Sequence, residues 1–189
     1  MTTIAFLGLG NMGGPMAANL VSAGHTVHGF DPVTALKEAA AAKGATVFDA
    51  AADAVAGADV VITSLPNGDI VKSVYAEVVP AATSGALLID TSTISVDDAR
   101  AVNAKATERG LAQIDAPVSG GIKGATAGTH EAVREAEPGP GPRDHAGPGQ
   151  RDDIGWNRLP SLSCRPTLVP LRELDRRDLR HVTGLERVE

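Results

Sequence analysis

The sequence predicts an α/β fold built on a doubly wound parallel sheet of about six strands. Two observations carry this prediction. Short apolar segments alternate with segments of helical periodicity as far as residue 118, and most apolar segments are continuous, as expected for strands buried on both faces. A glycine-rich turn also follows the first apolar segment, as in Rossmann-like folds. Neither pattern continues beyond residue 129, so an irregular or disordered tail is expected there.

The first strand and helix have clear limits. The segment TIAFLGLG (3–10) is a short apolar run that ends in glycines. The next segment (11–24) has apolar residues at helical spacing, with Asn11 expected to cap its start and Gly24 expected to take a left-handed conformation after its end. The remaining strands are predicted at 26–30, 46–48, 59–65, 86–92 and 112–118, and the remaining helices at 33–43, 50–57, 69–79 and 95–110.

Whole-chain composition limits the class of protein. A chain of 189 residues suffices for one domain with a sizeable core. Cys164 is the only cysteine, and Cys and His do not cluster at metal-ligand spacing, so neither an intrachain disulfide nor a metal is expected. No basic leader and no long apolar run is present, which favours a cytoplasmic protein without membrane contact. The formal net charge of −6 argues against nucleic acid as a partner.

The averages hide a boundary near residue 129. Residues 1–129 contain 5 Lys and 2 Arg, whereas residues 130–189 contain no Lys, 10 Arg and seven of the twelve prolines. One folded domain rarely shows such a change of composition. We therefore expect a dinucleotide-binding domain at 1–129 and a separate tail at 130–189.

The segment GLGNMG (8–13) predicts a dinucleotide site. It matches G-x-G-x-x-G, follows a strand and opens a helix, and Asp31 ends the second strand 23 residues after Gly8. The alternative is a tight turn without a ligand. We expect the whole loop and the acid to bind the cofactor: Gly8, Leu9, Gly10, Asn11, Met12, Gly13 and Asp31. A carboxylate near the ribose repels a 2′-phosphate, and no arginine lies nearby in HGFDPVTALK, so NAD is expected in preference to NADP.

Four segments resemble one known family. FLGLGNMGGPMAANL (6–20), TSLPNG (63–68), IDTSTIS (89–95) and IDAPVSGGIKGATAGT (114–129) are similar, in order and spacing, to the 3-hydroxyisobutyrate dehydrogenase family of β-hydroxy acid dehydrogenases. The resemblance covers residues 1–129. It implies an NAD-dependent oxidoreductase of a small β-hydroxy acid, specifically one that oxidises 3-hydroxyisobutyrate to methylmalonate semialdehyde in valine catabolism.

The resemblance also implies residue roles. Leu65 and Pro66 would border either the adenine or the nicotinamide side of the cofactor, and Thr93 would lie close to the nicotinamide. Ser119, Gly120 and Gly121 would bind the substrate carboxylate through a hydroxyl and backbone N–H groups, which form an anion-binding nest. The alternative for this last segment is a flexible turn without a ligand.

The tail departs from the family pattern. In the family, a lysine in a K-x-x-N-N pattern on a later helix transfers the hydroxyl proton, whereas residues 130–189 contain no lysine. The helical domain that forms the family's dimer surface is also not recognisable. A shift of reading frame that truncates the family pattern would explain this, and a genuine disordered tail with its own partner is the alternative. No catalytic residue is therefore assigned, and residual activity of this chain on 3-hydroxyisobutyrate is expected. The alternatives are an inactive NAD-binding remnant and a dehydrogenase or reductase of another small β-hydroxy acid.

Overall fold

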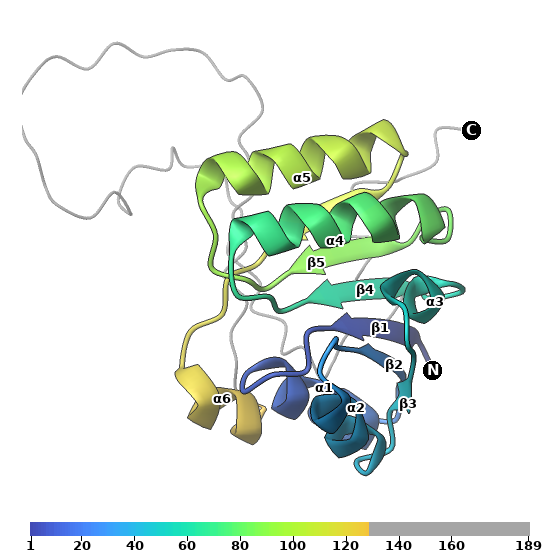
Figure 1. Ribbon diagram of the computed structural model, residues 1–189, viewed down its shortest axis with the longest axis vertical. Helices are drawn as coiled ribbons and strands as arrows, with labels where there is room; N and C mark the ends of the chain where they lie inside the picture. Colours follow the sequence, from blue (N-terminus) through green and yellow to red (C-terminus); the bar gives the residue numbers. More distant parts are fainter. Residues whose placement is uncertain (129–189) are drawn as a thin grey trace, which may run out of the picture.

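The computed structural model describes residues 1–128, which form one parallel sheet with helices on both faces (Figure 1). The expectations for 130–189 lie outside the described residues. The strands are β1 (Thr3–Leu7), β2 (Thr26–Phe30), β3 (Thr46–Val47), β4 (Val60–Thr63), β5 (Leu87–Asp90) and β6 (Ala112–Asp115). The helices are α1 (Gly13–Ser22), α2 (Thr34–Ala41), α3 (Ala51–Val55), α4 (Gly68–Ala81), α5 (Val96–Glu108) and α6 (Gly121–Ala127).

The strand order is β3-β2-β1-β4-β5-β6, and every neighbouring pair is parallel. The chain runs outward from β1 to β3, then crosses to β4 and continues outward to β6. The order therefore reverses between β1 and β4. Ligands of doubly wound sheets bind at such a reversal, beyond the carboxyl ends of the strands.

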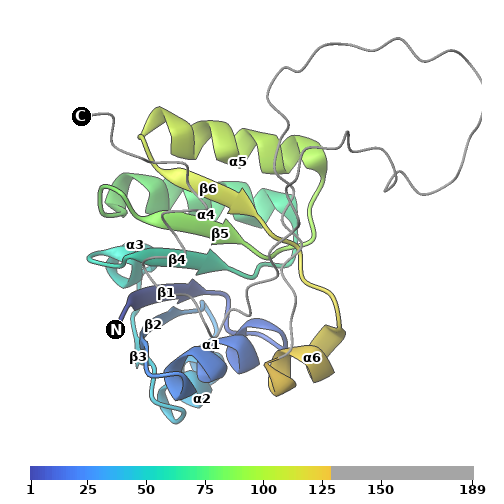
Figure 2. The same cartoon turned by 180° about the vertical axis from the view of Figure 1, so that it is seen from behind.

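Two hydrophobic cores stabilise the sheet, one on each face. The first lies under α1, α2 and α6 and includes Phe6, Leu20 and Ile62. The second lies under α3, α4 and α5 and includes Leu7, Tyr75 and Leu88. Figure 2, seen from behind, shows α6 beside α1, although the two helices are far apart in the sequence. Because both faces are covered, the central strands β1, β4 and β5 are almost completely buried.

The predicted fold class and the six predicted strands are confirmed, whereas two local predictions are wrong, the side-chain cap of α1 and the end of β6. Asn11 does not cap α1, since the N-cap residue is Met12 and no side chain caps it. Residues 119 and 120 precede α6, a short helix that begins at Gly121 and is not among the predicted helices. Gly24 does take a left-handed conformation, with φ +88°. Strand β6 ends at Asp115, before its predicted end, because Pro117 has no N–H to continue the ladder.

Within residues 1–128, every helix is too short or too polar to cross a bilayer.

Tyr75 on α4 is the largest fully buried side chain of the second core. Its hydroxyl has no hydrogen-bond partner of good geometry among residues 1–128. Burial, with a smaller effect of the nearby Asp90 carboxylate, raises the pKa of the Tyr75 phenol well above its usual range. The ring therefore contributes hydrophobic burial to stability, while the hydroxyl contributes little.

We expect Tyr75→Phe to leave the free energy of unfolding at neutral pH within about 1 kcal/mol of wild type, because the hydroxyl that it removes makes no hydrogen bond of good geometry. The two proteins should diverge at alkaline pH. The pKa of the Tyr75 phenol is higher in the folded than in the unfolded protein, so its contribution to stability is fully present below about pH 10 and is lost as pH rises further. Above that pH, the free energy of unfolding of wild type should fall by up to about 1.4 kcal/mol per pH unit relative to Tyr75→Phe. Urea unfolding of both proteins, at neutral pH and again above about pH 10, measures the two free energies of unfolding. A loss above about 2 kcal/mol in the variant at neutral pH would show that the hydroxyl is paired.

Candidate functional site

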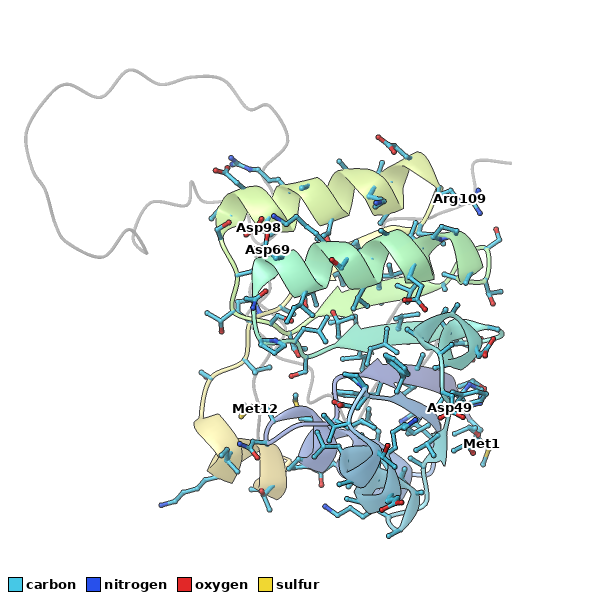
Figure 3. The ribbon with its side chains drawn as sticks, in the orientation of Figure 1. Met1, Met12, Asp49, Asp69, Asp98 and Arg109 are labelled. Atoms are coloured by element: carbon cyan, nitrogen blue, oxygen red, sulfur yellow. The ribbon has the colours of Figure 1, made fainter. Side chains whose placement is uncertain are left out.

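The loops that follow β1, β2, β4 and β5 meet at the carboxyl-end edge of the sheet. Figure 3 shows Met12, from the loop after β1, at the same edge as Asp69 and Asp98, which lie in the first turns of α4 and α5. Lys72 holds these two helix starts together, with its Nζ at 3.0 Å from Asp69 Oδ1 and 2.7 Å from Asp98 Oδ1. The edge predicted to bind the cofactor is therefore built from several separate segments of the chain.

Gly8 forms the tight turn at the end of β1. Its φ is +94°, a conformation that L side chains rarely adopt. Its N–H donates to the Phe30 carbonyl at 2.9 Å, and a Cβ on Gly8 would lie 2.2 Å from the Ser64 carbonyl oxygen. No side chain fits there, so the glycine is required by both conformation and packing.

Gly13 and Gly10 have different surroundings. A Cβ on Gly13 would lie 1.8 Å from the Gly8 carbonyl oxygen and 3.0 Å from the Phe6 ring, so only glycine lets α1 approach β1 this closely. A Cβ on Gly10 would meet nothing within 4 Å. The open space at Gly10 is what a backbone that approaches a pyrophosphate requires.

The N-terminus of α1 carries no side-chain cap. Helix α1 begins at Gly13, directly after the glycine loop, and its first turn contains no acidic residue. The Gly14 N–H donates to the Gly10 carbonyl at 2.9 Å and Pro15 has no N–H, so the Gly13 N–H and the partial positive charge of the helix dipole are what this end offers to a ligand. This end of α1 therefore suits an anion such as a phosphate.

Asp31 is buried, with 7% of its surface exposed, and both of its carboxylate oxygens accept backbone hydrogen bonds. Oδ2 accepts from Leu9 N at 2.9 Å, and Oδ1 accepts from Val33 N at 2.8 Å. The carboxylate thus fastens the glycine loop to the end of β2. Each carboxylate oxygen has a second lone pair, so Asp31 can still accept hydrogen bonds from a ribose.

The predicted residues of the next two loops lie beyond β4 and β5. Leu65 is half-buried, and its N–H donates to Ser92 Oγ at 2.9 Å. Pro66 and Thr93 are exposed. Because β4 and β5 are neighbours, both loops open onto the same edge as the glycine loop.

The segment Ser119–Gly121 is exposed and leads into α6. Gly120 has φ 96° and Gly121 has φ 56°, so both adopt left-handed conformations. Helix α6 is held against α1 by Asn19, whose Nδ2 donates to the Ala125 carbonyl at 2.7 Å. Asn19 was not predicted from the sequence, where its only signal is that a polar residue lies between the buried positions of α1.

Residues 1–128 contain no group of three or more His, Cys, Asp or Glu side chains that could hold a metal ion.

The sheet order, the glycine turn and the buried acid after β2 together define a dinucleotide-binding domain. Comparison with protein families agrees, since the model for the NAD binding domain of 6-phosphogluconate dehydrogenase matches residues 3–133. The chain belongs to this family, and its cofactor is NAD.

Individual relatives are dehydrogenases. A probable 3-hydroxyisobutyrate dehydrogenase of Mycobacterium bovis is 61% identical over 129 residues, which are 68% of this chain and 44% of the relative. An NAD-dependent L-serine dehydrogenase of Pseudomonas aeruginosa is 44% identical over 153 residues, covering 73% of this chain and 50% of the relative. The structure of Mycobacterium tuberculosis 3-hydroxyisobutyrate dehydrogenase with L-serine is 58% identical with a TM-score of 0.71, covering 72% of this chain and 47% of that one. The chain therefore spans about half the length of these relatives, and its resemblance to 3-hydroxyisobutyrate dehydrogenases is confirmed.

The two glycines provide a matched test. We expect Gly13→Ala to destabilise the fold by several kcal/mol, because its methyl group overlaps the Gly8 carbonyl. Gly10→Ala should stay folded, because its methyl group meets no protein atom, yet it should weaken NAD binding. Thermal unfolding and NADH titration measure the two effects. Full NAD affinity in a folded Gly10→Ala protein would contradict the placement of the pyrophosphate at Gly10.

Proposed function

We propose that this chain carries the cofactor-binding domain of an NAD-dependent dehydrogenase that oxidises 3-hydroxyisobutyrate to methylmalonate semialdehyde. The observation that supports this most strongly is the 61% identity to a probable 3-hydroxyisobutyrate dehydrogenase over 129 residues. Membership of an NAD-binding family supports the oxidoreductase class, and a dehydrogenase of this class acts on a small molecule. The proposed domain is 1–129, with 130–189 as a separate segment.

In this proposal, the adenosine half of NAD lies over β1 and β2. The backbone at Gly10 and the first turn of α1 would hold the pyrophosphate, with Leu9, Asn11 and Met12 along the same loop. Asp31 would accept hydrogen bonds from the adenosine ribose. The nicotinamide half would then lie over β4 and β5, near Leu65, Pro66 and Thr93.

The substrate would lie beyond β6, beside the nicotinamide. Ser119, Gly120 and Gly121 are exposed, and the left-handed conformations of the two glycines suit a nest of backbone N–H groups for a carboxylate. Lys123 is exposed on α6, so it stays hydrated and is not assigned as the base. Hydride transfer to NAD also requires a group that accepts the hydroxyl proton, and none is assigned in residues 1–128.

A second candidate substrate has specific support. One relative is named an L-serine dehydrogenase, and one similar structure contains L-serine. L-serine is also a small β-hydroxy acid, so the same carboxylate site would serve both substrates. The remaining alternative is an inactive protein that binds NAD, for which the absence of lysine from 130–189 is the motivating observation.

We expect Asp31→Ala to weaken NAD binding about tenfold or more and to narrow the preference for NAD over NADP. The substitution removes the ribose hydrogen bonds, the repulsion of a 2′-phosphate, and the bonds to Leu9 and Val33 that shape the loop. Titration with NADH and NADPH measures both effects. Asp53→Ala, which removes an exposed acid from α3, is the charge-matched control. Unchanged affinity for NADH in Asp31→Ala would remove Asp31 from the site.

We expect the 189-residue chain to oxidise 3-hydroxyisobutyrate at no more than a residual rate, even at saturating substrate and NAD. A missing general base lowers rates by roughly two to four powers of ten, and no lysine follows Lys123 in the sequence. The assay follows NADH absorbance with mass-verified protein and repeats it with L-serine. Turnover close to that of full-length family enzymes would contradict the expectation and reveal a base outside the family pattern.

A further inference from the structure

Asp90, the last residue of β5, is a fully buried acid that the proposed site does not use. Among residues 1–128, no lysine or arginine pairs with its carboxylate. Burying an unpaired carboxylate is unfavourable unless hydrogen bonds compensate for the lost hydration. The hydrogen bonds around Asp90 therefore indicate what this acid stabilises.

Asp90 Oδ1 accepts three hydrogen bonds from two strand ends. The Thr63 hydroxyl, at the end of β4, donates at 2.7 Å. The Ser92 hydroxyl donates at 2.6 Å and the Ser92 backbone N–H donates at 3.1 Å. Thr63 and Asp90 are also register partners in the sheet, so this cluster lies where the β4–β5 ladder ends.

The Ser92 hydroxyl connects this cluster to the loop after β4. The hydroxyl donates its proton to Asp90, so the lone pairs of Ser92 Oγ are free to accept a hydrogen bond. Ser92 Oγ accepts this bond from the Leu65 N–H at 2.9 Å. Leu65 in turn lies against the glycine turn, since a Cβ on Gly8 would lie 3.1 Å from Leu65 Cδ2. A continuous chain of contacts therefore runs from Asp90 through Ser92 and Leu65 to Gly8.

We propose that Asp90 and Ser92 are positioning residues for the nicotinamide half of the cofactor. Through the Ser92 hydroxyl they fix the loop of Leu65 and Pro66 relative to the loop of Thr93. This inference rests on the proposed function, which places these loops beside the nicotinamide. Neither residue contacts the cofactor in this arrangement, because both side chains are buried.

Ser92→Ala tests this inference in the full 189-residue chain. It removes the hydroxyl and leaves the Leu65 N–H without its partner. NADH affinity should fall roughly fivefold to tenfold, whereas affinity for ADP, which lacks the nicotinamide and its ribose, should change less than about twofold. Amide exchange at Leu65 should become faster. Ser92→Thr, which keeps a hydroxyl, should restore NADH affinity, and Ser22→Ala, which removes an exposed hydroxyl from the far end of α1, is the matched control.

The outcomes separate this inference from the proposed function. Wild type that binds neither NADH nor ADP overturns the proposed function itself. Wild type that binds both, with unchanged NADH affinity in Ser92→Ala, overturns only the positioning role. An equal loss for NADH and ADP also overturns it, because that pattern indicates a general loss of structure. If Ser92→Ala does not fold, Ser92→Cys replaces it, because a thiol keeps the shape of the side chain and is a weak hydrogen-bond donor.

Discussion

The close approach of α1 to β1 is the constraint on which the rest of the site depends. A Cβ on Gly13 would lie 1.8 Å from the Gly8 carbonyl oxygen, so helix and strand meet with no space for a side chain. This contact places the uncapped start of α1 at the end of β1, next to the reversal of strand order. It also brings Met16, Ala17 and Leu20 onto the sheet, where they are buried in the first core. One packing requirement thus sets both the core and the position of the proposed anion site.

Much of the fold could be predicted because it depends on local patterns. Strand β2 occupies the predicted residues 26–30, since an apolar run between Gly24 and Pro32 has clear limits. Helix α6 was missed because it has only seven residues, begins with Gly121 and is followed directly by Gly128, so the sequence there resembles a glycine-rich loop. Its position depends instead on the contact between Asn19 and the Ala125 carbonyl, 106 residues apart in the sequence.

In the candidate site too, features with a local sequence pattern could be predicted, whereas features that depend on contacts between distant residues could not. The glycine motif and Asp31 have a recognisable spacing, so the sequence alone predicts that they bind the cofactor. The sequence did not reveal that Asp31 also fastens the glycine loop through Leu9. The cluster of Thr63, Asp90 and Ser92 could not be predicted either. Its hydrogen bonds join residues up to 27 positions apart, and they depend on the register of β4 against β5. Short polar residues after a strand look the same in sequence whether they face solvent or are buried.

The loops of the two proposed halves of the site, after β1 and after β4, are held by the same kind of hydrogen bond, from a loop N–H to a side chain. Parallel strands lose backbone partners where they end, so the first N–H groups of the following loops need acceptors. On one side, the Asp31 carboxylate after β2 accepts the Leu9 N–H from the loop after β1. On the other, the Ser92 hydroxyl after β5, oriented by Asp90, accepts the Leu65 N–H from the loop after β4. In each case a side chain that follows one strand accepts a backbone N–H from the loop after the neighbouring strand, where the ladder has ended. These hydrogen bonds hold the loops in place at the edge of the sheet, beyond the last ladder bonds. A dinucleotide binds at this edge of such sheets and needs a preformed surface there.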